Sequence, residues 1–477
     1  MTYKSQPIRA PLERFPTNIP GLDTILHGGL FRGGVYMIQG VPGAGKTILA
    51  NQICFGSIGT GGLVVYLTLL AESHTRLIQQ LQTLEFFDRT AIPDRIYYVS
   101  AFRQLQSAGL EGVLSTAQTE VASHAATVLV IDGLSVAAEA AESIQDMKRL
   151  VHDLQALAGM QGCTIFLLTS GDSTLVRAED TMVDGRIFLE ADLLGPQPER
   201  RISIMKSRGD GALFGSHSFV IGNDGIRVFP RLESVSKDPP PAYDAVLTTG
   251  VGFMDRMFET AGLQVGSTTV VCGPSGSGKT SIGLHFLDES SADEPGLAIG
   301  FFETPDMLLR KAHALGLKLG DAVRSGEVEL MWHAPAEYLL DELAYAILAR
   351  IDERKVKRLV IDGVSGIFGA IGYKQRAHRF LPCLFNEFSR RGVTALVTHE
   401  AHDEGSDSSR TSSGSALAMF ADNVINLESR HGAEGLVRSL AIRKARSSSS
   451  DSSPRDFVIS RTGITSDESK RYRKRAE

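Results

Sequence analysis

Two segments of eight residues repeat one spacing of glycine, lysine and threonine. The first reads Gly40-Val41-Pro42-Gly43-Ala44-Gly45-Lys46-Thr47, and the second reads Gly273-Pro274-Ser275-Gly276-Ser277-Gly278-Lys279-Thr280. Both fit the pattern G-x-x-x-x-G-K-[ST], a loop whose backbone N–H groups surround the phosphates of a nucleotide. A glycine-rich turn before a helix is the alternative for one copy, and the second copy argues against it.

Each residue type in this loop has a physical role. Glycine permits positive φ and close approach of the backbone, and the helix that follows presents unpaired N–H groups to an anion. Lys46 and Lys279 can reach the β- and γ-phosphates, and the hydroxyls of Thr47 and Thr280 can ligate Mg²⁺. We therefore predict two nucleotide sites, with phosphate contacts also from Gly40, Gly43, Ala44, Gly45, Gly273, Ser275, Gly276, Ser277 and Gly278.

Two further carboxylates follow apolar runs at matching places. Residues 127–132 and 358–362 each contain a short apolar run, which ends in Asp132 or in Asp362, and these aspartates lie 362 − 132 = 230 positions apart. Such a run is typical of a buried parallel strand that delivers a carboxylate at its C-terminal edge. We predict that both aspartates hold Mg²⁺ through water. Capping of the next helix is the alternative for either one.

Glu72 and Glu303 are the candidates for activating water. Each follows an apolar strand, at 63–70 and 297–302, and precedes a hydroxyl residue. Nucleotide hydrolysis needs a water aligned for in-line attack, and a carboxylate at a strand end can orient or polarise it. A helix-capping role is the alternative, because both glutamates stand where a helix begins.

The positions of these residues require a duplicated α/β fold. The two lysines are 279 − 46 = 233 positions apart, a period of one whole domain. Strands alternate with helical segments in each half, which predicts a mainly parallel sheet with helices on both faces and a ligand site at the C-terminal strand edge. The expected domains are 1–235 and 246–446, joined by a stiff Pro-rich linker at 236–245, with 447–477 as the remainder and a Ser-rich, basic tail.

Bulk composition fits a soluble globular protein. The chain has 477 residues, 43% of them hydrophobic, and a net charge of −6, which argues against coating nucleic acid. The first 15 residues lack the apolar core of a signal peptide, and no apolar run is long enough to cross a bilayer. The four cysteines form no C-x-x-C pair, so we expect reduced thiols in a cytoplasmic protein: Cys54, Cys163, Cys272 and Cys383.

The combined pattern resembles a known family. Each half has a segment of the form G-[LF]-x-x-[IM], then the phosphate loop, a Glu-[ST] pair and an apolar Ile-Asp-Gly strand. This set is similar to the RecA-type ATPases, and its tandem arrangement over roughly 16–464 resembles the KaiC-like family. The resemblance implies two tandem RecA-like P-loop NTPase domains that bind ATP and Mg²⁺.

The resemblance also implies contacts between subunits. Late in each half stands a Lys-x-Arg segment, formed by Lys206 with Arg208 and by Lys444 with Arg446. In KaiC-like proteins this segment reaches the nucleotide of the neighbouring subunit in a hexameric ring, where two cations stabilise phosphate charge. By residue chemistry alone, these four side chains are solvated charges at strand ends.

Some residues depart from the family pattern. Its members commonly carry two adjacent glutamates after the strand, whereas Ala71 and Phe302 stand before the single glutamates here. The clock protein of the family phosphorylates an adjacent Ser-Thr pair, which aligns with Ala418-Met419. We expect that Ser412, Ser413 or Ser415 can replace this pair, so an autokinase reaction stays open while a timekeeping switch has little support.

Three hypotheses for the function follow. The leading one is a ring-forming ATPase with a signalling or regulatory role, possible partners being an adaptor or a two-component kinase. The second is a nucleic-acid motor, which the acidic balance and the lack of an aromatic-basic platform oppose. The third is a scaffold whose state follows nucleotide binding without turnover.

Overall fold

The structure is a computed structural model that describes most of the chain in two units. Its contacts divide the chain into Met1–Arg231 and Leu232–Glu477. The described residues are 13–71, 74–172, 179–194, 197–209, 211–235, 238–334, 339–369, 376–400, 417–432, 435–446 and 449–466.

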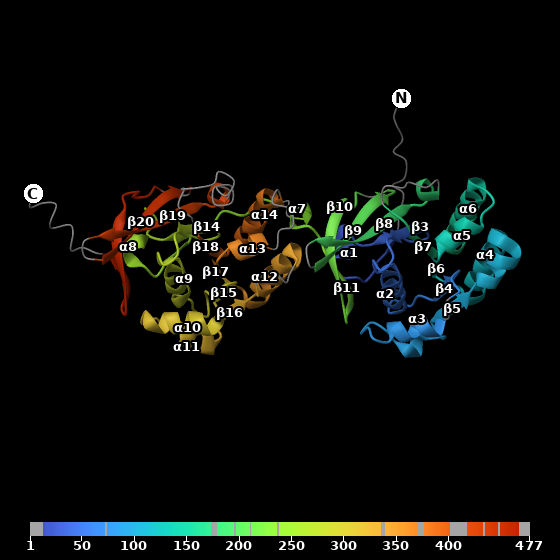
Figure 1. Cartoon of the computed structure of the whole chain (residues 1–477), viewed down its shortest axis with the longest axis horizontal. Coiled ribbons are helices and arrows are strands. Elements are labelled where there is room, and N and C mark those ends of the chain that lie inside the picture. The colour runs from blue at the N-terminus through green and yellow to red at the C-terminus, as the bar shows by residue number, and fades with distance from the viewer. Residues whose placement is uncertain are drawn as a thin grey trace, which may run out of the picture. The chain divides into compact units, whose positions relative to one another are not determined.

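Strands and helices alternate through the first unit (Figure 1). They are β1 (Arg14–Phe15), α1 (Leu22–Ile25), β2 (Leu30–Phe31), β3 (Val35–Gly40), α2 (Lys46–Ile58), β4 (Val64–Thr68), α3 (His74–Leu81), η1 (Arg89–Ala91), β5 (Ile96–Ser100), α4 (Phe102–His124), β6 (Val128–Asp132), α5 (Leu134–Ala140), α6 (Ile144–Gln161), β7 (Thr164–Ser170), η2 (Glu179–Thr181), β8 (Gly185–Leu194), β9 (Gln197–Ser207), β10 (Gly215–Gly222) and β11 (Gly225–Phe229).

The second unit repeats the plan. Its elements are α7 (Leu232–Val235), β12 (Val246–Leu247), α8 (Gly252–Asp255), β13 (Leu263–Gln264), β14 (Thr268–Gly273), α9 (Lys279–Asp288), β15 (Gly296–Gly300), α10 (Pro305–Ala314), α11 (Leu319–Ser325), β16 (Val328–Trp332), α12 (Leu340–Arg354), β17 (Arg358–Asp362), α13 (Ser365–Gly369), α14 (Ala377–Arg390), β18 (Thr394–Glu400), β19 (Asn423–Gly432), β20 (Gly435–Ala445), β21 (Arg455–Ser460) and β22 (Gly463–Ser466).

Each unit is built on a sheet of nine strands with the same connectivity. The orders are β5-β4-β6-β7-β3-β8-β9-β10-β11 and β16-β15-β17-β18-β14-β19-β20-β21-β22. In this order, the first six strands of each sheet, which run from β5 to β8 and from β16 to β19, pair in parallel. The last three strands of each sheet are added antiparallel. The expectation of two mainly parallel sheets is therefore confirmed.

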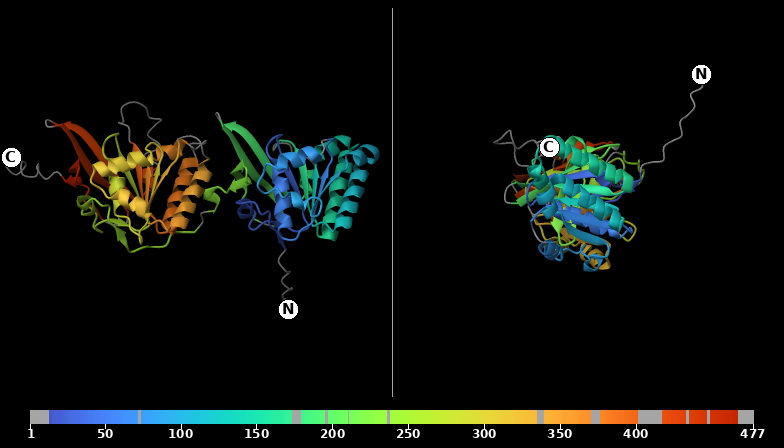
Figure 2. Two further views of the ribbon diagram at one scale, coloured as in Figure 1. Left: turned by 90° about the horizontal axis from the view of Figure 1, so that it is seen from below. Right: turned by 90° about the vertical axis from the view of Figure 1, so that its right-hand side faces the viewer.

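Helices cover both faces of each sheet (Figure 2). In the first unit α4, α5 and α6 bury apolar side chains in one core cluster with β3, β4, β6 and β7, while α2 supplies buried residues to the opposite face. In the second unit α12, α13 and α14 pack on one face and α8 to α11 on the other. Strands buried on both faces read as continuous apolar runs, which is why β6 and β17 were visible in the sequence.

The same contact between an aspartate and a threonine precedes the phosphate loop in each unit. Oδ1 of Asp23 accepts hydrogen bonds from the amide and the hydroxyl of Thr17, at 2.8 and 2.7 Å. Oδ1 of Asp255 accepts the same two bonds from Thr249, at 2.9 and 2.6 Å. These pairs fix the chain ahead of the two phosphate loops, and the sequence reading did not single them out.

The segment between the two sheets belongs to the second unit. The division falls at Arg231, four residues before the expected boundary at 235, because α7 packs against α14 and Leu232 lies in the second core. Further along, the hydroxyl of Tyr243 donates to the carbonyl of Arg390 at 3.3 Å. Asp238 lies 3.4 Å from the guanidinium of Arg390.

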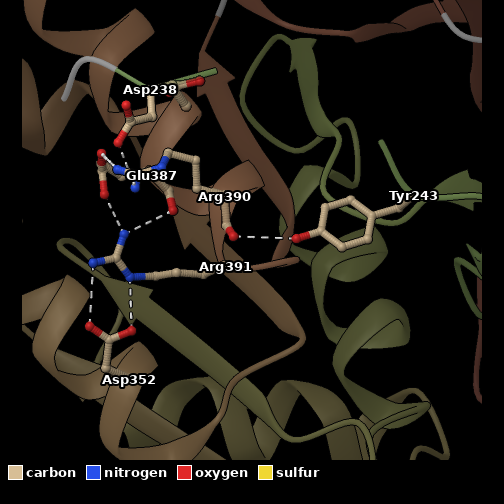
Figure 3. A network of polar contacts seen from close by, with 7 residues as sticks. Asp238, Tyr243, Asp352, Glu387, Arg390 and Arg391 are labelled. Carbon is tan, nitrogen blue, oxygen red and sulfur yellow. Dashed lines mark hydrogen bonds and ion pairs between the residues drawn. The ribbon is translucent and has the colours of Figure 1, made fainter. Parts of the chain in front are cut away.

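Figure 3 shows these contacts at the end of α14. Arg391 pairs with Asp352 of α12 at 2.8 Å and also with Glu387, which is bonded to Arg390 at 3.0 Å as well. The described part of the expected linker, 238–245, therefore begins with a residue, Asp238, that contacts a charged side chain of the second unit.

Candidate functional site

Both phosphate loops connect a central strand to a helix at the C-terminal edge of the sheet. The first loop joins β3 to α2, and the second joins β14 to α9. The residues before the helices, Gly45 and Gly278, have φ of 103° and 106°, a region that strongly favours glycine. Neither helix has a side-chain cap, so its first N–H groups face the loop, as an anion site requires.

The two lysines lie folded on their own loops. Nζ of Lys46 donates to the carbonyls of Gly40 (2.8 Å) and Val41 (3.0 Å), and Nζ of Lys279 donates to the carbonyls of Gly273 and Pro274, both at 2.8 Å. Burial lowers the pKa of both lysines, an effect that nearby carboxylates oppose. A phosphate would offer each ammonium an anionic partner in place of neutral carbonyls.

The threonine of each loop lies against the aspartate of a neighbouring strand. The Thr47 hydroxyl is 3.5 Å from Asp132 at the end of β6, and the Thr280 hydroxyl is 3.1 Å from Asp362 at the end of β17. The sequence alone had already indicated that these four residues occupy equivalent positions in the two halves. Asp132 at the end of β6 does not cap the next helix, because Gly133 occupies the N-cap position of α5 and no side chain caps that helix.

A different neighbour holds each aspartate. In the first unit the phenol of Tyr66 on β4, fully buried, donates to Asp132 at 2.7 Å. In the second unit the hydroxyl of Thr398 on β18 donates to Asp362 at 2.6 Å. Burial raises the pKa of Asp362, and the two threonine hydroxyls lower it. The two carboxylates are thus fixed from opposite neighbouring strands.

The donor sets fit a magnesium ion. No group of three or more His, Cys, Asp or Glu side chains suited to a metal occurs among the residues that the structure describes. Mg²⁺ does not need such a group, since it is commonly held by one or two protein oxygens together with waters and substrate phosphates. A hydroxyl beside a carboxylate, at Thr47 with Asp132 and at Thr280 with Asp362, meets that requirement.

Glu303 lies at the second site and forms an ion pair there. Its two carboxylate oxygens accept from Nζ of Lys311 on α10, at 2.6 and 2.8 Å. The predicted counterpart Glu72 lies outside the described residues. The two connections also differ in length. Glu303 is 303 − 300 = 3 positions after the partner of Asp362 in β15, whereas Glu72 is 72 − 68 = 4 positions after the partner of Asp132 in β4.

Two arginines reach the loops from within their own unit. Nη1 of Arg200 on β9 donates to the carbonyl of Gly43 at 2.8 Å, and Nε of Arg438 on β20 donates to the carbonyl of Gly276 at 3.2 Å. The sequence reading missed both. A comparison of the halves could have found them, since each stands six positions before the lysine of its Lys-x-Arg segment (206 − 200 = 6 and 444 − 438 = 6).

The second loop borders a cavity of about 510 Å³. Glu303, Lys311 and Asp362 line it together with Lys279 of the loop. Glu400, the last residue of β18, lines it too and was not predicted; its charge opposes the lowering of the Lys279 pKa. Phe302, directly before Glu303, also lines this cavity, with 60% of its surface exposed.

The side chains of the Lys-x-Arg segments donate to backbone carbonyls of their own units. Lys206 and Arg208 donate to the carbonyl of Thr181, at 2.6 and 3.0 Å. Lys444 and Arg446 donate to the carbonyl of Met419, at 3.0 and 2.9 Å. Neither Lys444 nor Arg446 lines the cavity of the second site. The expected phosphate acceptors lie outside the described residues: Ser412, Ser413 and Ser415.

None of the described helices is both long enough and apolar enough to span a membrane.

Comparison with known proteins gives the family. The KaiC ATPase family model matches residues 15–233 and 247–471. The circadian clock oscillator proteins KaiC of Rippkaea orientalis and Picosynechococcus sp. are each 25% identical to the chain, over 95% of it and over 88% and 89% of the relative. The KaiC of Acaryochloris marina is 24% identical over 96% of the chain and 90% of its own length. With its two RecA-like P-loop domains, the chain belongs to the KaiC ATPase family.

Proposed function

We propose that this KaiC-family ATPase binds Mg·ATP at both loops, hydrolyses it, and uses the nucleotide to assemble a ring with a regulatory output. The observation that carries the proposal is the constellation present in both units, a loop lysine with a Thr–Asp contact at the sheet edge. These are the groups that position and neutralise phosphates in phosphoryl transfer, which is mainly a matter of positioning and electrostatics.

The residues have distinct roles in this proposal. The loop amides, Lys46 and Lys279 hold the phosphates, while Thr47 with Asp132 and Thr280 with Asp362 hold Mg²⁺, which would neutralise phosphate charge. Glu303 orients water at the second site, and Glu72 has this role at the first. Arg200 and Arg438 lie on the loop carbonyls of their own units, where they can turn to a bound phosphate.

The ring belongs to the proposal as well. Lys206, Arg208, Lys444 and Arg446 would act on the nucleotide of a neighbouring subunit, and in support Lys444 and Arg446 are not among the residues that line the cavity of their own unit. Two relatives of the chain are named circadian clock oscillator proteins. We do not extend timekeeping to this chain, because Ala418 and Met419 carry no hydroxyl at the aligned acceptor positions.

The test is incubation of the full chain with γ-labelled ATP and Mg²⁺, following free phosphate and protein-bound label. We expect Mg²⁺-dependent free phosphate, and a higher oligomer on a sizing column when Mg·ATP is present. Label on the protein, mapped to Ser412, Ser413 or Ser415, would establish the autokinase alternative. If the chain binds nucleotide but neither releases phosphate nor becomes labelled, the scaffold hypothesis remains. Release that requires single-stranded DNA would point to the nucleic-acid motor.

A further inference from the structure

The second site contains a cation that belongs neither to the phosphate loop nor to the pair of Thr280 and Asp362. Lys311 on α10 lies 311 − 280 = 31 positions after the end of the loop, yet its ammonium lines the same cavity as Lys279 and Asp362. Its position at the sheet edge follows from α10, which begins at Pro305 directly after Glu303 and Thr304. Lys311 therefore faces the reaction site and not open solvent alone.

Both oxygens of Glu303 are engaged by this cation. The distances from Nζ of Lys311 are 2.6 Å to Oε1 and 2.8 Å to Oε2, and the side chains are 38% and 24% exposed. Hydrogen bonds between ionised partners at this length are the strong ones. The ion pair therefore favours one orientation of the carboxylate, with both oxygens turned toward the ammonium of Lys311.

A carboxylate in this state is poorly suited to activate water. General-base assistance needs an oxygen within hydrogen-bond reach of the proton that it takes, whereas both oxygens of Glu303 are directed at Lys311 here. Glu303 must loosen from Lys311, at least in part, before it can serve the reaction.

The first unit has a neutral residue at the matching position. Lys311 is six positions after the first residue of α10 (311 − 305 = 6), and Gln80 is six positions after the first residue of α3 (80 − 74 = 6). The next residues, Leu81 and Ala312, are both buried, which supports this pairing of the helices. The chain itself thus supplies the matched neutral substitution, Lys311→Gln.

We propose that Lys311 is a positioning residue that holds Glu303 in a resting orientation and thereby restrains hydrolysis at the second site. This inference rests on the proposed function. It concerns the second site only, because Glu72 of the first site lies outside the described residues and the residue of α3 that matches Lys311, Gln80, carries no charge.

The experiment uses the full chain with the first site disabled by Lys46→Ala, so that phosphate release reports the second site. Lys311→Gln in this background should raise kcat about threefold to tenfold, a part of the contribution usual for a general base, with little change in KM. Lys311→Arg, which keeps a cation in place, should give a smaller rise. The double variant Glu303→Gln/Lys311→Gln should fall to the rate of Glu303→Gln alone, because the gain acts through that carboxylate.

Several outcomes would overturn the inference. A lower kcat together with a higher KM in Lys311→Gln would make Lys311 a phosphate ligand. A gain that persists without Glu303, or an unchanged kcat, would also contradict it. If the Lys46→Ala parent and its Lys311→Gln variant both release no phosphate while wild type does, the second site does not hydrolyse and the restraint proposal fails. If wild type also releases none, the proposed function itself fails.

Discussion

Replacing Lys46 and Lys279 together by alanine is expected to reduce Mg·ATP hydrolysis to background. Each ammonium is the one group of its loop that carries a full positive charge into the phosphate site, and it now rests on neutral carbonyls at 2.8–3.0 Å. Removal of one preorganised charge-stabilising donor typically costs about 100- to 1,000-fold in rate. The loss at each site should be of that size.

The single variants divide the activity between the units. Phosphate release that survives in Lys46→Ala belongs to the second site, and release that survives in Lys279→Ala belongs to the first. Lys318→Ala, an exposed lysine before α11, is the matched control and should keep the wild-type rate. Circular dichroism should be unchanged in all variants. More than a tenth of the wild-type rate in the double variant would contradict the assignment of the sites to these loops.

The sequence alone was sufficient for the parts of the site that are local in the chain. The loops, the strands before them and the helices after them are consecutive, so glycine spacing and apolar runs predict them together. Asp132 and Asp362 were found for the same reason, because each closes an apolar strand that is buried on both faces. The duplication then turned two weak patterns into a strong one.

The missed residues depend on pairings between distant segments. Arg200 meets Gly43 across 157 positions, and Tyr66 meets Asp132 across 66, because β9 folds back along the sheet and β4 pairs with β6. Nothing in the local pattern specifies such strand orders. The ion pair of Lys311 with Glu303 spans only eight positions but joins a strand end to a helix. Its geometry appears only once the connection between them is folded.

The fold shows the same limit at the boundary between the units. The Pro-rich run predicted a stiff linker at 236–245, and such a composition does not show which side chains are contacted by the residues on either side of it. Arg376, just before α14, binds Glu233 of α7 at 2.8 Å and Asp341 of α12 at 2.6 Å. A pattern search cannot pair residues 143 and 35 positions apart.

Arg376→Ala is expected to destabilise the second unit by about 3–5 kcal/mol, the usual cost of removing one partner from a buried ion pair. The side chain of Asp341 is fully buried, at 0% exposure, and Arg376 is its cationic partner. Trp332 on β16 is the single tryptophan of the chain, so its fluorescence in a urea titration follows this unit alone. Arg324→Ala, which breaks an exposed pair with Asp321, should cost less than about 1 kcal/mol.

The loss in Arg376→Ala should also depend on pH, with a definite sign. Burial raises the pKa of Asp341, while the hydrogen bond and charge of Arg376 lower it, so the variant should raise that pKa further. A carboxyl group whose folded pKa exceeds its unfolded value is penalised as pH rises through the folded pKa. The deficit should therefore be larger at pH 8 than at pH 5, and Asp341→Asn should recover part of it. Equal losses at both pH values, with no recovery, would show that Arg376 acts through packing and not through charge.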